Sequence, residues 1–361
     1  MKILFISRIP VRGVSGGRYL SALFAERLAR GGHEVEYWVN YNNALIFPVQ
    51  IMKTFRLRKY FPLVLGRNGF FDQVLFRVYR IIAKRWFKKA FDHVVIVPEE
   101  GSVRLHEFFY DIANVMGTKV HLLNFETPNW FNSLAPVKRD PARWDGWSFI
   151  ADRAESVISI SKTSDSYARM FYGHGKEYRW FEFPVFQESD LIPLDWDERE
   201  NSAVCISRMD PHKGLDGLLE FISNAYGLKT FHLVIGSMKL DEDFVQMLVD
   251  VSNKNGINLQ IHKKISHHDK FRLLGSVKYL VFPTYFEGLG MPPIEALASG
   301  CKVAAFELPV LREISAHIEF AVPGNFKELS SIVSQGLDCK PPESSTESVS
   351  KYEIDALVDF I

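Results

Sequence analysis

The chain has 361 residues, of which 47% are apolar and 24% charged, and its 43 basic residues are balanced by 43 acidic ones. This composition is typical of a globular protein large enough for two domains. A net charge of zero argues against a general nucleic-acid binder, and three scattered cysteines argue against a disulfide framework or a zinc site.

The first half of the chain alternates apolar runs of strand length with helix-like stretches. The runs are residues 3–6, 35–39, 94–97, 120–123 and 157–160. This alternation predicts a parallel sheet with helices on both faces. The run at 3–6 is too short for the core of a signal peptide, and no apolar stretch reaches 18 residues. We therefore expect a cytoplasmic protein without a membrane span.

The segment 51–90 is strongly basic. It contains eleven basic residues against one acid, Asp72, and is also rich in Phe, Leu, Ile and Val. A basic amphipathic segment is attracted to anionic lipid. It predicts peripheral attachment to the inner leaflet of a membrane, and a solvated helix face followed by a loop is the alternative.

A polar, acidic stretch at 187–202 interrupts the alternation and is interpreted as a linker. A second series of apolar runs follows, at 203–206, 231–235, 259–262, 279–282 and 302–305. We expect two doubly wound domains that face each other across a cleft at the carboxyl ends of their strands. The predicted domains are 1–186 and 203–345, and residues 346–361 are expected to form a closing helix that packs on the first domain.

Two cations follow the first strand of the second series, in the sequence AVCISRMDPHKG. Arg208 lies at the end of the apolar strand, and Lys213 lies five residues later on a turn that ends at Gly214. Arginine and lysine at the mouth of a strand suit a diphosphate leaving group, because negative charge builds on it as its bond breaks. An isolated pair of this kind is more often solvated than functional.

The segment EGLGMPPIE supports the functional interpretation. Glu287 and Glu295 flank a Gly-x-Gly turn, which follows an apolar run and leads into a helix. Such a turn offers backbone N–H groups to an anion, and a proline at the first helical position loses no hydrogen bond. The carboxylates accept hydrogen bonds from hydroxyls, so the segment is suited to hold an anion between two polyols.

These marks resemble family 4 of the glycosyltransferases, enzymes with the GT-B fold. They are E-x7-E (Glu287, Glu295), R-x4-K-G (Arg208, Lys213, Gly214) and an N-terminal glycine loop with Gly16 and Gly17. The similarity runs from the first residue to about Glu313. The resemblance implies a metal-independent, retaining hexosyltransferase that uses a nucleotide-diphosphate sugar, most often UDP-linked, in polysaccharide biosynthesis, and that needs no cofactor.

The resemblance also implies the roles of individual residues. Arg208 and Lys213 would neutralise the leaving diphosphate, Glu287 would accept from hydroxyls of the donor sugar, and Glu295 from those of the ribose. The remaining donor contacts are expected from the backbone: Gly16, Gly17, Gly288, Leu289 and Gly290 at phosphate and sugar, Lys264 and Ile265 at the base.

The acceptor is expected to be a saccharide or a lipid-linked saccharide that enters past Arg18. Many family members carry a histidine after the strand that faces the donor sugar, whereas this chain has Glu126 in the segment FETP. A carboxylate there could orient an acceptor hydroxyl, and a structural turn before Pro128 is the alternative. Two other functions stay open: a GT-B nucleotide-sugar epimerase acting by hydrolysis, and a non-catalytic sugar-nucleotide-binding protein.

No metal site is expected, although two D-x-D sequences occur. Asp241 precedes a predicted helix, where an acid favours the helix dipole, and Asp195 lies in the predicted linker. Ser266 and Asp269 are spaced as a capping box, which accounts for the neighbouring His267 and His268 better than a metal site does.

Overall fold

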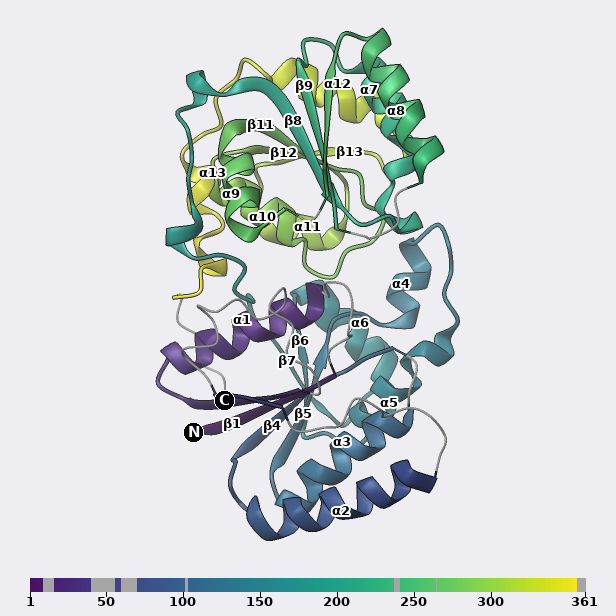
Figure 1. The fold of residues 1–361 in the computed structure, drawn as a ribbon, viewed down its shortest axis with the longest axis vertical. Helices are drawn as coiled ribbons and strands as arrows, with labels where there is room; N and C mark the ends of the chain where they lie inside the picture. The colour runs from purple at the N-terminus through teal and green to yellow at the C-terminus, as the bar shows by residue number, and fades with distance from the viewer. Residues whose placement is uncertain are drawn as a thin grey trace. The chain divides into compact units, whose positions relative to one another are not determined.

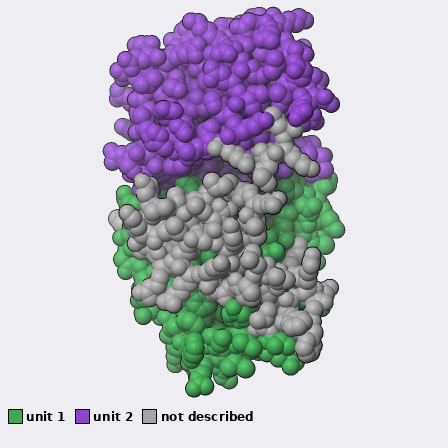
Figure 2. All heavy atoms as spheres, viewed as in Figure 1, with its two compact units in different colours: residues 1–133, 138–184, 354–361 green, residues 134–137, 185–353 purple. Residues whose placement is uncertain are grey.

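The computed structural model describes residues 1–8, 16–39, 56–59, 70–100, 103–236, 241–263 and 265–355. The chain divides into two compact units, which Figure 2 colours separately. Unit 1 comprises residues 1–133, 138–184 and 354–361, and unit 2 comprises residues 134–137 and 185–353. Within the described ranges, none of the helices combines the length and hydropathy required to cross a bilayer.

Unit 1 contains a seven-stranded, wholly parallel sheet in the order β3-β2-β1-β4-β5-β6-β7 (Figure 1). The strands are β1 Lys2–Ser7, β2 Glu34–Val39, β3 Arg56–Lys59, β4 His93–Val97, β5 Lys119–Asn124, β6 Ser156–Ser159 and β7 Glu177–Trp180. The helices are α1 Gly16–Arg30, α2 Phe70–Trp86, α3 Val103–Met116, α4 Pro128–Leu134, α5 Asp145–Ala151 and α6 Lys162–Tyr172. A 3-10 helix, Pro141–Trp144, precedes α5.

Unit 2 contains a six-stranded parallel sheet in the order β10-β9-β8-β11-β12-β13. Its strands are β8 Glu200–Ser207, β9 Thr230–Ile235, β10 Asn258–Lys263, β11 Val277–Phe282, β12 Lys302–Phe306 and β13 Ile318–Ala321. Its helices are α7 Leu218–Asn224, α8 Glu242–Lys254, α9 His267–Ser276, α10 Met291–Ala298, α11 Pro309–Ile314, α12 Phe326–Gly336 and α13 Ser344–Glu347.

Helices cover both faces of a parallel sheet because its central strands carry apolar side chains on both faces. In unit 2, one core joins Phe221 of α7, Leu248 of α8 and Val333 of α12 to Phe231 and Tyr279 of the sheet. The helices α9 and α10 pack on β11 from the other face. Figure 1 shows α7, α8 and α12 together on one side of this sheet.

The predicted alternation of strands and helices is confirmed, since every predicted run overlaps a strand of one of the two parallel sheets. Three edge strands, β3, β7 and β13, were not predicted. The aromatic residues Trp130, Phe131, Trp144 and Trp147 are at most 4% exposed, so they pack in the core of unit 1. Cys205 and Cys301 are also buried.

The segment 187–202 belongs to unit 2. Its last three residues belong to β8, and Trp196 is buried. The Arg199 guanidinium donates hydrogen bonds to four backbone carbonyls, those of Leu194, Val277, Ser299 and Gly300. At the end of the chain, α13 is followed by a 3-10 turn at Ser350–Tyr352, and residues 356–361 of the predicted closing helix lie outside the described residues.

Candidate functional site

The strand order of unit 2 reverses between β8 and β11, which pair with each other in parallel. In open α/β sheets, ligands bind outside the carboxyl ends of the strands at such a switch point. The loop 208–214 directly follows β8, and the loop 283–290 directly follows β11. The topology therefore brings the two motifs predicted from the sequence to the same edge of one sheet.

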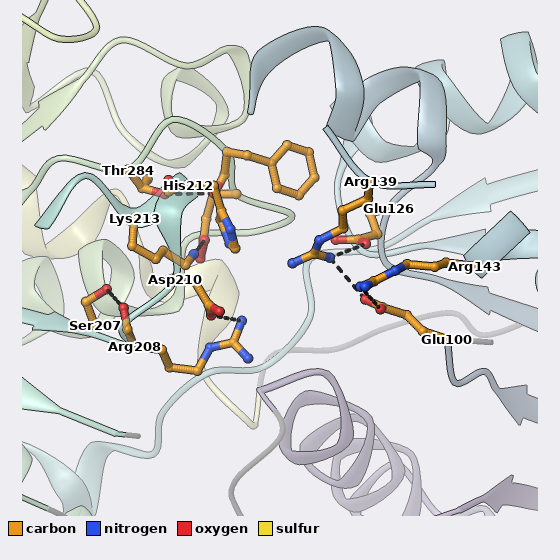
Figure 3. A network of polar contacts seen from close by, with 12 residues as sticks. Glu100, Glu126, Arg139, Arg143, Ser207, Arg208, Asp210, His212, Lys213 and Thr284 are labelled. Carbon is orange, nitrogen blue, oxygen red and sulfur yellow. Dashed lines mark hydrogen bonds and ion pairs between the residues drawn. The ribbon is translucent and has the colours of Figure 1, made fainter. Parts of the chain in front are cut away.

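The two loops are held together by hydrogen bonds to the His212 carbonyl, of which Figure 3 shows the one from Thr284. The His212 carbonyl accepts a 2.8 Å hydrogen bond from the Tyr285 N–H and a 3.2 Å bond from the Thr284 hydroxyl. Gly214 has a φ of 64°, and a Cβ added there would lie 2.1 Å from the Pro283 carbonyl oxygen. Only glycine permits both this conformation and this close approach, which explains the last position of R-x4-K-G.

These contacts place Lys213 beside Glu287. The Lys213 Nζ lies 2.6 Å from the Glu287 Oε2, and the two side chains are 12% and 16% exposed. Arg208 is 55% exposed and lies 3.2 Å from Asp210. The lysine and glutamate therefore neutralise each other in a largely buried position, whereas the arginine extends into solvent.

The glycine turn leads into α10 somewhat differently from the prediction. Gly290 is the N-cap, with a φ of 89°, and the helix begins at Met291. Pro292 and Pro293 thus occupy the second and third helical positions, not the first. The N–H groups there would also lack a partner within the helix, so the prolines cost no hydrogen bond. Because proline has no N–H group, positions 292 and 293 offer none to an anion.

Glu295 lies one turn into α10 and is 2% exposed. Its Oε1 lies 2.6 Å from the Nζ of Lys270 on α9, a residue that the sequence analysis did not single out. The start of α9 is fixed by Ser266, whose hydroxyl accepts a 3.0 Å hydrogen bond from the Asp269 N–H, and this confirms the predicted cap. Asp241 likewise caps α8, by accepting from the N–H groups of Asp243 and Phe244.

A cavity of about 370 Å³ lies between α9 and the strands β9 and β10. Ile265, predicted near the nucleotide base, is among its lining residues, whereas Lys264 lies outside the described residues. His232 and His262 also line it, with their ring nitrogens 3.1 Å apart. Burial, with a smaller contribution from His262, lowers the pKa of His232 to about 4.

In unit 1, Arg18 connects the ends of β1 and β4. Its guanidinium donates to the carbonyls of Arg8 at 3.2 Å and Pro98 at 3.1 Å. Burial lowers the pKa of Arg18, although Glu99 opposes this shift. The neighbouring Gly17 is close to Phe125, whose ring would lie 3.2 Å from an added Cβ. Part of the hydrogen-bonding capacity of Arg18 is thus used within the fold.

Glu126, which follows β5, lies 3.5 Å from Arg139. Arg139 also contacts Glu100 at 3.0 Å and covers the Phe131 ring at 4.0 Å. Figure 3 shows Arg143 directed toward Glu100 as well, at 3.0 Å. The sequence analysis missed both arginines, because they follow α4 instead of a strand. Glu126 therefore belongs to an ion-pair network at the carboxyl edge of this sheet.

Comparison with known proteins gives these sites a family context. Residues 187–352 match the family described as Glycosyl transferases group 1. The matched region includes both motifs of the unit 2 site.

A curated relative is the O-antigen chain mannosyltransferase RfbU of Salmonella typhimurium, which is 29% identical over 166 residues. The match spans 45% of this chain and 45% of the relative.

Solved structures resemble the chain over nearly its whole length. Sucrose-phosphate synthase of Thermosynechococcus elongatus has a TM-score of 0.75 at 17% identity, over 98% of this chain and 96% of that one. Anabaena HepE in complex with UDP and glucose has a TM-score of 0.70 at 14% identity, over 99% and 94%. At this level of identity the likeness concerns the fold, and the predicted pair of Rossmann-like domains is confirmed.

Proposed function

We propose that this protein is a retaining, metal-independent glycosyltransferase of family 4. It would move a hexose from a nucleotide-diphosphate sugar to a saccharide or lipid-linked saccharide in polysaccharide biosynthesis. The observation that carries the proposal is the meeting of the Arg208–Gly214 loop with the Glu287–Glu295 segment at the β8/β11 switch point. The family match over residues 187–352 supports it.

In the proposed reaction, the bond from the sugar anomeric carbon to the diphosphate oxygen breaks. A bond from that carbon to the acceptor oxygen forms on the same face, and the acceptor proton passes to the leaving phosphate. Lys213 and Arg208 stabilise the charge that develops on the diphosphate. Because these two cations are present, the leaving group needs no metal ion.

We propose that Lys213 and Glu287 neutralise each other only until the donor binds. Both side chains are largely buried, so each would be costly to leave uncompensated. When a nucleotide sugar binds, the diphosphate replaces Glu287 as the partner of Lys213, and the sugar hydroxyls replace Lys213 as the partners of Glu287. Backbone groups at Gly16, Gly17 and residues 288–290 complete the proposed phosphate and sugar contacts, and Glu295 accepts from the ribose.

We assign the acceptor side to Arg18 and to Glu126 in the ion-pair network of unit 1. A lipid-linked acceptor is displayed at a membrane, and the basic segment 51–90 would be attracted to anionic lipid. We therefore propose a peripheral protein that works on the cytoplasmic side of such a membrane.

The comparisons suggest different sugars, because HepE structures hold UDP and UDP-glucose while RfbU is named for mannose transfer. We lean toward UDP. Calorimetric titration with UDP-, GDP- and ADP-linked sugars identifies the donor, and absence of binding by every nucleotide sugar would refute the proposal.

Turnover then tests the chemistry. Lys213→Ala should lower the transfer rate at least tenfold, about 1.4 kcal/mol in the barrier, and chelation by EDTA should leave it largely unchanged. Donor consumption without any acceptor would support the epimerase or hydrolase instead. Donor binding without turnover across an acceptor panel would support a binding protein.

A further inference from the structure

The outer face of α2 combines exposed apolar and basic side chains. Val74, Val78 and Ile81 are 41%, 45% and 66% exposed. Their spacing of four and three residues places them in one row along the helix. Three exposed large apolar side chains in a row are unusual on a surface that only faces water.

The inner face of α2 is already occupied by unit 1. Tyr79 packs edge-on against Phe108 of α3, and Ala83 and Phe87 join the core that includes Trp38. Figure 1 shows α2 running along the outer side of α3. The apolar row therefore points away from the core to which α2 is attached.

Basic side chains border this row. The sequence from Gln73 to Phe91 contains six basic residues and no acidic one. Arg85 continues the row four residues after Ile81, and Arg77 and Lys84 each lie three residues after one of its members; all three are exposed. Arg80 is partly compensated by Asp111 at 3.4 Å. Beyond the row, Trp86 is 71% exposed at the end of the helix.

We propose that this face of α2 is an interfacial surface that lies on anionic lipid. The apolar row would enter the boundary between headgroups and acyl chains, and Arg77, Lys84 and Arg85 would contact the lipid phosphates. Nucleic acid would also attract the cations, but its phosphate backbone offers nothing to the apolar row beside them. The inference rests on the membrane attachment proposed above and assigns it to a defined surface, but it does not depend on the transfer reaction.

The test is sedimentation of the full chain with phosphatidylcholine vesicles that do or do not contain phosphatidylglycerol. The wild type should bind only the anionic vesicles, more weakly as salt rises. Replacing Arg77, Lys84 and Arg85 by Gln should weaken binding about 100-fold, at about 1 kcal/mol per charge. Replacing Val74, Val78 and Ile81 by Ser should weaken it at least about tenfold, and the part of binding that survives high salt should disappear.

Matched variants in unit 2 control for overall charge and hydropathy. Lys229→Gln, Lys254→Gln and Lys327→Gln remove three exposed charges, and Tyr226→Ser, Met247→Ser and Val322→Ser remove three exposed apolar side chains. Both triple variants should bind like the wild type. Quenching by brominated lipid should disappear in Trp86→Phe and persist in Trp180→Phe, whose tryptophan is also exposed.

Four results would overturn the proposal. They are a wild type that does not sediment with anionic vesicles, α2 variants that bind like the matched controls, equally strong binding to nucleic acid, and self-association that depends on the apolar row. Nucleotide binding by each variant, measured in parallel, shows whether the donor site is intact. Failure of the lipid surface is thereby distinguished from failure of the proposed reaction.

Discussion

Each glutamate of the unit 2 site is paired with a lysine, and the two pairs predict different effects when the carboxylates are neutralised. Glu287 lies 2.6 Å from Lys213, and Glu295 lies 2.6 Å from Lys270. In the proposed site, Lys213 faces the diphosphate, which a free nucleotide shares with its sugar. Glu287 therefore competes with the nucleotide for that lysine, whereas Glu295 contacts the ribose directly.

Glu287→Gln should accordingly leave the affinity for the free nucleotide unchanged or raise it. The affinity for the nucleotide sugar should fall about 5- to 30-fold. A hydrogen bond to a charged group contributes about 1.5–3 kcal/mol and a neutral one about 0.5–1.5, so the exchange loses about 1–2 kcal/mol. Glu295→Gln should lower the affinity for the nucleotide and for the nucleotide sugar by a similar factor, because both contain the ribose.

Calorimetric titration of each variant with the nucleotide and with its sugar measures both effects. Glu319→Gln is a suitable control, because it removes another lysine-paired carboxylate of unit 2, 3.4 Å from Lys302. If Glu287→Gln and Glu295→Gln lost the same affinity for the free nucleotide, the roles of the two glutamates would be wrongly divided.

Three further changes test the structure around this site. Gly214→Ala should destabilise unit 2 by about 2–4 kcal/mol in thermal unfolding and reduce turnover, whereas Gly256→Ala, with a φ of 68° and open space for a Cβ, should lose only about 1–2 kcal/mol. Lys270→Met should lower stability by about 2–3 kcal/mol because it leaves the Glu295 charge buried, and the double variant with Glu295→Gln should recover most of this loss; an unchanged melting temperature would contradict the pairing. The lowered pKa of His232 means that the folded state favours the neutral ring, so its contribution to stability is complete above pH 6.5 and is lost as the pH falls toward 4. His232→Gln should flatten that dependence by at most about 1.4 kcal/mol per pH unit, and a parallel profile would refute the assignment.

The central strands and the edge strand β10 could be predicted from the sequence, whereas the edge strands β3, β7 and β13 could not. A strand that is buried on both faces, such as β4 or β9, is a continuous apolar run. The edge strands β3 and β7 read RLRK and EYRW, and β13 reads IEFA. Edge strands commonly carry charged side chains, so a search for apolar runs finds the interior of a sheet but misses edge strands of this composition.

The site could be predicted where the topology determines it. Arg208 directly follows β8, and Glu287 lies in the loop that follows β11. These strands are neighbours in the sheet, so the order of the strands alone brings the two loops to one edge. Lys270 could not be found in this way. It meets Glu295 because α9 packs on α10, and the packing of two helices depends on the details of their side chains. Arg139 and Arg143, which contact Glu100, were missed because they follow α4, in a loop and a 3-10 helix, and not a strand of the sheet.

The glycines of the two motifs show why a motif alone does not reveal what its residues do. The sequence suggests glycines at the approach of a phosphate, but Gly214 is required because the backbone of Pro283 lies against it. Its role is to let two site loops meet, and only through them does it affect a ligand. At Gly16, by contrast, an added Cβ would meet nothing within 4 Å among the described residues. Packing among those residues therefore does not explain this glycine, and its proposed place at the donor phosphate, where the backbone would approach a ligand closely, stays a prediction.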